Sequence, residues 1–306
     1  MYSRIKELLN REKSPRYKSL SYIAKALFTL LLLYLIFRRV DLATAWQNIC
    51  KLSLASVLGV CALTILRHYI QYHNWRHALH LNAGYVSDLR QERASYLLAL
   101  PLRFLIPGGH AAFAKIFYLK NTSLLASFIA TFVERLFMSW ATWTFAAIAA
   151  FFFFPHLSIS LRILFILIAA FLPLWTALIM SLKSSFRPHL PAYATLAPKM
   201  MLLQIANTLL MFLQYYIILN QLGAISAIDT WLGMGLTNLA NSIPITISGL
   251  GLREGFAIHF LQAFNFSSEQ AVAATLSLFI FHDLLPAFVG TVVLFKTKRV
   301  SANPLV

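Results

Sequence analysis

The sequence has 306 residues, 59% of them hydrophobic, and 26 basic against 10 acidic residues give a formal net charge of +16. Apolar runs of about 17 residues or more recur along the chain, which is typical of helical membrane proteins and excludes a soluble globular domain. The basic residues gather at the ends of these runs, so the charge indicates membrane topology and anionic lipid headgroups rather than nucleic acid.

The chain reads as a basic cytoplasmic segment (1–20), one membrane domain (21–295) and a basic cytoplasmic tail (296–306). A cleaved signal peptide is an alternative for the first span, because Ala43-Thr44-Ala45 is an A-x-A site. We prefer an uncleaved span. Full spans are predicted at about 21–37, 52–72, 122–154, 161–182, 199–222 and 270–295.

Two further apolar stretches fit poorly as single spans. One covers about 94–120 and is interrupted by "PLRFLIPGGH"; the other covers about 228–265 and is interrupted by "NSIPITISGLGLRE". Each is predicted to form two half-helices around a Pro/Gly break. Backbone at such a break must be buried in protein or line a wet cavity, and paired broken segments indicate a transporter's binding site.

The distribution of positive charge orients these elements. If both broken stretches are re-entrant hairpins, most Lys and Arg residues fall on the side of the termini, which are therefore predicted to be cytoplasmic. Three full spans separate the hairpins, so the first enters from the cytoplasm and the second from the far side. The predicted class is an all-α polytopic membrane protein with about six full spans and two re-entrant hairpins in an inverted repeat.

The second hairpin carries the most specific candidate site. Gly249 and Gly251 permit a tight turn, and a half-helix that begins after them would point its free N–H groups at an anion such as phosphate. Arg253 adds a guanidinium that grips phosphate with two bonds. Glu254 is not expected to pair with Arg253, since helical neighbours point to different faces. Asp283 is the alternative partner, in a purely structural ion pair.

Other charged residues in apolar surroundings are candidates for the same substrate-binding site. Lys115 follows the first break as Arg253 follows the second, although it is nearly as well explained as a lysine that reaches the cytoplasmic surface. Arg67 and Arg162 are interpreted as marking span ends, and Trp75 as part of an interfacial belt. The remaining candidates are Gly108, Gly109, Arg103, Glu134, Arg135, His282 and Asp283.

Signatures of enzymes are missing from the sequence. It contains no HExxH, G-x-S-x-G or P-loop pattern, and the spacing of His259 and His282 relative to the acidic residues does not favour a metal site. We therefore predict no catalytic residue, no metal and no cofactor.

The "GLGLREG" stretch (249–255), with Pro244 upstream, resembles the flippase-like membrane domain of lysylphosphatidylglycerol synthases and their standalone relatives. "IPGG" (106–109) with Lys115, "VERL" (133–136) and "RHYIQYHNWRHAL" (67–79) resemble that family's other motifs in the same order. Ile247-Ser248 stand where the family usually has Pro-Gly, and Ala112 where it often has an acid. The resemblance implies movement of a lipid between leaflets, without the lysine transfer of the fused synthetase domain.

The leading hypothesis is transbilayer movement of an anionic phospholipid or lipid-linked precursor in a bacterial or archaeal plasma membrane. The alternatives are an ion-coupled transporter of a small soluble anion, a membrane-embedded lipid-modifying transferase, and an accessory subunit of an envelope-biogenesis complex. The expected partners are the lipid substrate and the bilayer, with a homo-oligomer as a further possibility and no nucleic acid.

Overall fold

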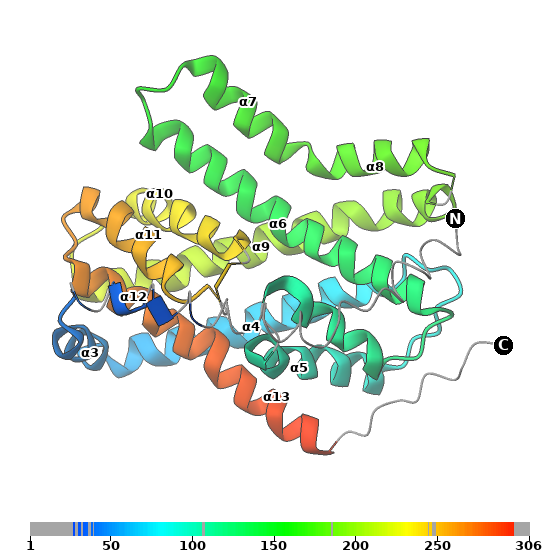
Figure 1. Ribbon diagram of the computed structural model, residues 1–306, viewed down its shortest axis with the longest axis horizontal. Coiled ribbons are helices and arrows are strands. Elements are labelled where there is room, and N and C mark those ends of the chain that lie inside the picture. The colour runs from blue at the N-terminus through cyan, green and yellow to red at the C-terminus, as the bar shows by residue number, and fades with distance from the viewer. Residues whose placement is uncertain are drawn as a thin grey trace.

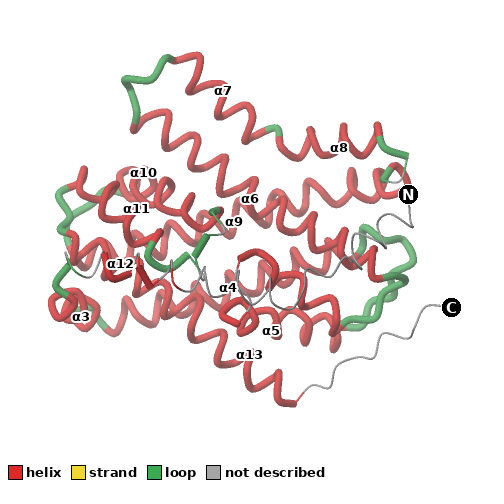
Figure 2. The backbone as a smooth tube through the Cα atoms, viewed as in Figure 1, coloured by secondary structure: helices red, strands yellow, loops and turns green. Residues whose placement is uncertain are grey.

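In the part of the chain that it describes, the computed structural model contains helices and no strand (Figures 1 and 2). The described residues are 40–105, 108–184, 186–243, 245–246 and 249–296, with a few positions between 27 and 38. The elements are α3 (Leu42–Cys50), α4 (Leu54–Leu79), α5 (Leu89–Leu105), η1 (Gly108–Tyr118), α6 (Leu124–Phe153), α7 (Ile159–Ala170), α8 (Leu172–Leu182), η2 (Arg187–His189), α9 (Leu190–Leu222), α10 (Ala227–Thr237), η3 (Asn238–Ser242), α11 (Leu252–Leu261), η4 (Gln262–Phe264), α12 (Ser268–Leu278), η5 (Phe279–Leu284) and α13 (Leu285–Lys296).

Four helices among the described residues are long and apolar enough to cross a membrane: α4, α6, α9 with η2, and the continuous α12–η5–α13. The pair α7 and α8 becomes a fifth if it counts as one span. The predicted first span at 21–37 lies mostly outside the described residues. A multi-pass helical membrane protein is thus confirmed, whereas the count of six spans remains a prediction.

The predicted span at 161–182 is bent by 57° between α7 and α8. Pro173, in the first turn of α8, has no N–H to continue the hydrogen-bond ladder of α7, and its ring crowds the preceding turn. The Ala170 carbonyl at the bend accepts a hydrogen bond from Trp140 Nε1 at 2.9 Å. The bent pair runs along the outer edge of the bundle beside α6 (Figure 1).

The two stretches predicted to be broken are indeed interrupted helices. In the first, α5 is followed by the 3₁₀ segment η1, which packs against it. In the second, α10 and η3 lead through a turn to α11, which packs back on α10. At the α10–α11 crossing a Cβ on Gly233 would lie 2.8 Å from Leu261 Cδ2, so the helices approach closely. The return of each hairpin to its own side of the membrane is a prediction from the distribution of positive charge.

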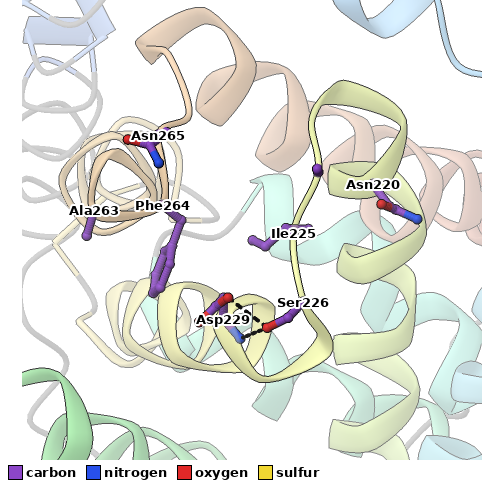
Figure 3. Close-up of a pocket in the computed structure, with 8 residues that line it drawn as sticks. Asn220, Ile225, Ser226, Asp229, Ala263, Phe264 and Asn265 are labelled. Atoms are coloured by element: carbon purple, nitrogen blue, oxygen red, sulfur yellow. Dashed lines mark hydrogen bonds between the residues drawn. The ribbon is translucent and has the colours of Figure 1, made fainter.

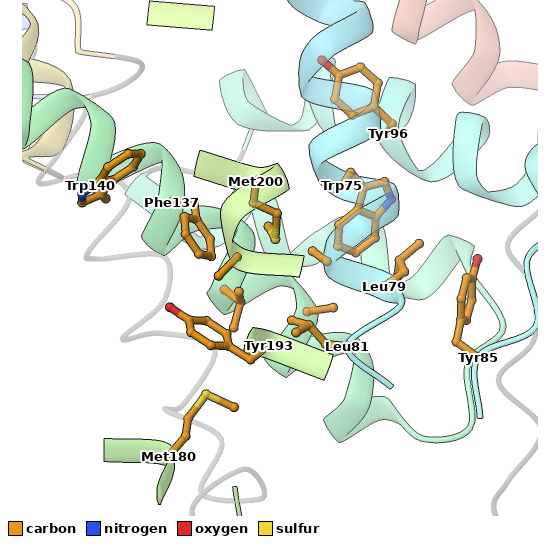
Figure 4. Close-up of a cluster of buried hydrophobic side chains, with 14 of the residues drawn as sticks. Trp75, Leu79, Leu81, Tyr85, Tyr96, Phe137, Trp140, Met180, Tyr193 and Met200 are labelled. Carbon is orange, nitrogen blue, oxygen red and sulfur yellow. The ribbon is translucent and has the colours of Figure 1, made fainter. Parts of the chain in front are cut away.

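The largest hydrophobic cluster lies where α4, α6 and α9 pack together, and Figure 4 shows its side chains. Trp75 is completely buried there beside Phe137 and Met200. The prediction that Trp75 belongs to an interfacial belt is therefore wrong, because this end of α4 is covered by other helices rather than by lipid headgroups. The cluster fixes α4 against α9, the two helices that contribute most of the buried amide side chains.

Candidate functional site

Asp283 is the carboxylate on which the two broken-helix stretches converge. Arg103, from α5, places Nη1 2.9 Å from Asp283 Oδ1, and Arg253, from α11, places Nη1 3.7 Å from Oδ2. Asp283 is buried within η5, a π-helical segment of the last long helix. One acid thus links an arginine from each hairpin, which brings together three residues that the sequence identified separately.

Arg253 also pairs with its neighbour Glu254, contrary to the sequence-based expectation. Its Nε and Nη2 atoms lie 3.2 and 3.0 Å from Glu254 Oε1. The Cβ directions of the two residues do diverge, but Glu254 turns back toward the helix start, where its Oε2 accepts from Gly251 N–H at 2.6 Å. The long arginine side chain then folds over the carboxylate. Both side chains are buried, so this is a desolvated ion pair.

The glycines before α11 take backbone conformations that other residues rarely adopt. Gly249 and Gly251 have φ of 76° and 81°, in the region open mainly to glycine. A Cβ on Gly249 would also lie 2.7 Å from Asn241 Oδ1. The predicted tight turn is therefore present, and a protein carboxylate, Glu254, already occupies one of the N–H donors that the sequence assigned to an anionic ligand.

The π-helical segment is held by α4 and α5. Pro286 has no backbone N–H and so deprives the preceding turn of one donor. The His282 carbonyl in that turn lies 3.1 Å from His68 Nε2, which must carry the proton because a carbonyl only accepts. His68 Nδ1 lies 2.9 Å from Tyr96 Oη, and the rings of His68 and His282 stack with centroids 4.8 Å apart. A π-helical segment changes the rotational position of the residues around it on the helix. These contacts to His68 therefore fix the position of Asp283 along and around the last long helix.

Arg67 is buried in the middle of α4, so its interpretation as a span-end marker is wrong. Its Nε donates to Asn207 Oδ1 at 3.3 Å and its Nη1 to Gln214 Oε1 at 2.5 Å, both on α9. These acceptors are uncharged amides, and no carboxylate lies within ion-pair distance of Arg67 among the described residues. Arg67 is next in the chain to His68, which contacts His282, the neighbour of Asp283.

A second buried charge pair joins η1 to α6. Lys115 Nζ contacts Glu134 Oε2 and lies 3.6 Å from the centre of the Trp75 ring. Lys115 is 3% exposed, so it does not reach the membrane surface as its alternative interpretation required. Arg135, the next residue after Glu134, is exposed. Lys115 lies on η1, which packs against α5, the helix that carries Arg103.

The structure leaves three predicted site residues with smaller roles. Gly108 and Gly109 form the start of η1, of which only the backbone is described there. His282 contributes its carbonyl and its ring stacking, while its Nδ1 is buried without a hydrogen-bond partner among the described residues. Arg162 lies in the first turn of α7 and donates to the Phe151 carbonyl at 2.7 Å, as expected of a residue at a span end.

A surface hollow of about 480 Å³ lies apart from these charges, at the ends of α9 and α11 and the start of α10 (Figure 3). Two of its polar residues bind each other: Ser226 Oγ donates to Asp229 Oδ2 at 2.7 Å and accepts from Asp229 N–H at 3.0 Å. Asp229 is the one charged residue among those that line the hollow, and we assign the candidate site to the buried charges instead.

The residues that sequence reasoning missed are the amides around Arg67. Val60, Thr64, Arg67, Gln71, Asn74 and Ala78 recur at alternating spacings of four and three, which places them on one face of α4. This is the spacing of a helix–helix seam. Polar residues at seam positions inside an apolar span are the signal that would have identified them.

The fold and the site define a multi-pass helical membrane protein with a buried, charged centre between two broken helices. A model of the lysylphosphatidylglycerol synthase TM region matches residues 22–290. The chain belongs to this family, and the match covers the membrane region that gives the family model its name. No curated protein matches the chain closely.

Proposed function

We propose that the protein moves an anionic phospholipid, or a lipid-linked precursor, between the two leaflets through a polar site in the middle of the membrane. The observation that carries the proposal is an excess of positive charge around Asp283. Among the described residues, Arg67, Arg103 and Arg253 give three cations and Glu254 and Asp283 give two carboxylates, which leaves a net charge of +1.

An uncompensated charge in a membrane interior costs about 2.5–3.5 kcal/mol on the mildest scale. A guest anion would remove this cost, and a lipid phosphate is an anion that enters from the bilayer itself. The guanidinium groups of Arg253 and Arg103 can each bind a phosphate with paired hydrogen bonds. Asp283 and Glu254 are then the resident anions that share these guanidinium groups with the phosphate.

The two hairpins supply a physical route for this exchange. Under the proposed topology α5–η1 enters from the cytoplasm and α10–α11 from the far side, and each contributes one arginine to Asp283. A headgroup held by Arg103 would face one leaflet and a headgroup held by Arg253 the other, while the acyl chains stay in lipid. Transfer between the arginines would carry the headgroup across.

The experiment is transbilayer movement of a fluorescent anionic phospholipid in proteoliposomes, read by quenching from outside. Arg253→Ala is expected to slow movement at least about tenfold, because a charge-assisted hydrogen bond contributes about 1.5–3 kcal/mol. Arg187→Ala is the matched control, since Arg187 is exposed and its side chain binds the Ser181 carbonyl and no other described residue.

A second variant separates binding from folding. Arg253→Ala combined with Glu254→Ala removes both members of the buried pair, so neither charge is left alone. A folded double variant without lipid movement supports the proposal. Equal movement in all variants would overturn it, and a wild type that takes up soluble anions but moves no lipid would establish the ion-coupled transporter instead.

A further inference from the structure

His282 stands at the edge of the charged centre, and the proposed binding step makes no use of its side chain. The imidazole stacks on that of His68 from α4, with ring centroids 4.8 Å apart and planes 16° from parallel. Asp283, the next residue, pairs with Arg103 and Arg253. A titratable ring therefore lies beside the residues to which we assign the guest anion.

His68 has both of its ring nitrogens satisfied with a single ring proton. Its Nε2 carries that proton and donates to the His282 carbonyl at 3.1 Å. Its Nδ1 lies 2.9 Å from Tyr96 Oη and can accept from the phenol O–H. A second proton on His68 would require Tyr96 to turn its O–H away. His68 thus orients the stack, and the ring that remains to take up a proton is that of His282.

The side chain of His282 makes no hydrogen bond to a described residue, and its Nδ1 is buried. Buried polar atoms are almost always paired, so an unpaired one needs an explanation. Protonation of this ring requires no cavity and breaks no described side-chain hydrogen bond. It would nevertheless create a charged donor that has no acceptor among the described residues, so the stabilising charge must arrive with the guest.

The charged and titratable groups around the stacked imidazoles come from four elements. They are Arg67 on α4, Tyr96 and Arg103 on α5, Arg253 and Glu254 on α11, and Asp283 on η5. The last long helix carries no other titratable residue between Glu269 and Lys296, which stand at its two ends.

These charges make a proton and an anion depend on each other. A proton on His282 alone would add to the net positive charge of the centre, which is unfavourable in a membrane interior. A singly charged anion and a proton together leave the net charge of the empty centre unchanged. The anion is therefore what permits the proton, and the proton in turn strengthens the hold on the anion.

We propose that His282 takes up a proton from water when the anionic guest binds, which makes the proton a second, coupled ligand of the centre. This rests on the proposed function for the identity of the guest and adds the ion that binds with it. Coupling between two sites is reciprocal and typically changes affinity about 5- to 150-fold. Acidification is thus expected to strengthen anion binding at least about fivefold.

The test compares anion binding on either side of the ordinary pKa of histidine, at about pH 5.5 and about pH 8. The probe is a short-chain phosphatidylglycerol, whose phosphodiester keeps one negative charge at both pH values. Thermal unfolding in an uncharged detergent gives the lipid concentration at which half of the Tm gain is reached. In the wild type this concentration is expected to be at least about fivefold lower at the acidic pH.

His282→Gln removes the titrating ring and keeps a polar side chain of similar size. The variant is expected to need the same lipid concentration at both pH values. His259→Gln is the matched control, since His259 is an exposed histidine of α11, and it should respond to pH as the wild type does. The remaining histidines are present in both variants, so their contribution to the pH response is common to the comparison.

Proton uptake by the wild type supplies a readout that does not depend on a variant. In weakly buffered solution near the ordinary pKa of histidine, addition of the phosphatidylglycerol is expected to withdraw up to about one proton per protein, seen with a pH indicator. Phosphatidylcholine of the same chain length carries no net charge and should withdraw none. Equal uptake with both lipids would contradict a role for the anion.

The outcomes separate this inference from the transport proposal. Equal lipid concentrations at the two pH values in the wild type, or an unchanged pH response in His282→Gln, would overturn the inference and leave transport standing. A pH response that depends on His282 without lipid movement in proteoliposomes would keep the inference and reject transport. Neither a Tm gain nor proton uptake at either pH would overturn both.

Discussion

Glu254 serves two groups with one carboxylate. Oε2 accepts from the Gly251 N–H at the start of α11, and Oε1 accepts from Arg253. A carboxylate in the first helical turn is favoured by the helix dipole, and here it also neutralises a buried guanidinium. The stability of the α10–α11 hairpin and the net charge of the site therefore both depend on the Glu254 carboxylate.

Substitutions at Glu254 should separate these two effects. Glu254→Ala is expected to destabilise the protein by about 3–5 kcal/mol, because it removes the closer carboxylate partner of a buried cation, at 3.0 Å, and leaves only Asp283 at 3.7 Å. Glu254→Gln retains an acceptor for Gly251 N–H and should cost less. Unfolding in detergent gives both values, with Glu269→Ala in the first turn of α12 as the control. An equal loss of unfolding free energy for Glu254→Ala and Glu254→Gln would show that the hydrogen bond from Gly251 N–H contributes nothing to stability.

At the scale of elements, the broken helices depend on close backbone contact. Gly290 in α13 lies against α5, where a Cβ would come within 2.4 Å of the Leu97 carbonyl oxygen and 2.6 Å of Pro101 Cδ. Pro101 cannot donate to the Leu97 carbonyl four residues before it. The Leu97 carbonyl, left without its helical donor, thus packs against Gly290, and any side chain at position 290 would collide with it. This contact between α5 and α13 positions Arg103 near Asp283.

Gly290→Ala should therefore force α5 and α13 apart. Overpacking of this kind costs about 1–3 kcal/mol, and we expect a lower Tm together with slower lipid movement. Gly59→Ala in α4 is the matched control, since its nearest neighbour would be Ile217 Cδ1 at 4.0 Å. The control should be neutral or slightly stabilising because alanine favours helix. Similar losses for both glycines would contradict the role of the α5–α13 crossing.

At the scale of the whole molecule, the proposal requires the two hairpins to enter from opposite sides. In that topology the loops around Ser87 and Ser184 are cytoplasmic, and the end of α3, with Cys50, lies on the far side. Cys50 is exposed, and Cys61 in α4 is partly buried.

Labelling of intact cells with a membrane-impermeant maleimide tests this arrangement. In a Cys61→Ala background, Cys50 should react from outside. With Cys50 also replaced, Ser87→Cys and Ser184→Cys should react only after the cells are opened, whereas Ser226→Cys should react without opening. Reaction of Ser184→Cys from outside would contradict this arrangement. It would mean that the middle spans have the opposite orientation and that both interrupted stretches cross the membrane completely.

The sequence predicted most of the helices because lipid demands long apolar runs and satisfied backbone, which are local properties. It also predicted the breaks at the hairpins, since positive φ at Gly249 and Gly251 is a property of glycine itself. The bend at Pro173 and the π-helical segment were not anticipated, although prolines mark both places. The partners of Arg67 lie some 140 residues away, beyond the reach of any local pattern.

By itself, the sequence determined that this is a multi-pass helical membrane protein of the lysylphosphatidylglycerol synthase membrane family, with buried charge at two broken helices. Hydrophobicity, the conformational freedom of glycine and the spacing of motifs are local properties that can be read directly from the order of the residues. Only the tertiary structure decided that Arg103 and Arg253 share Asp283, that Glu254 turns back to pair with Arg253, and that Arg67 is buried against amides of α9. Ion pairs and burial depend on which helix faces which, and that is settled by packing between segments far apart in the chain.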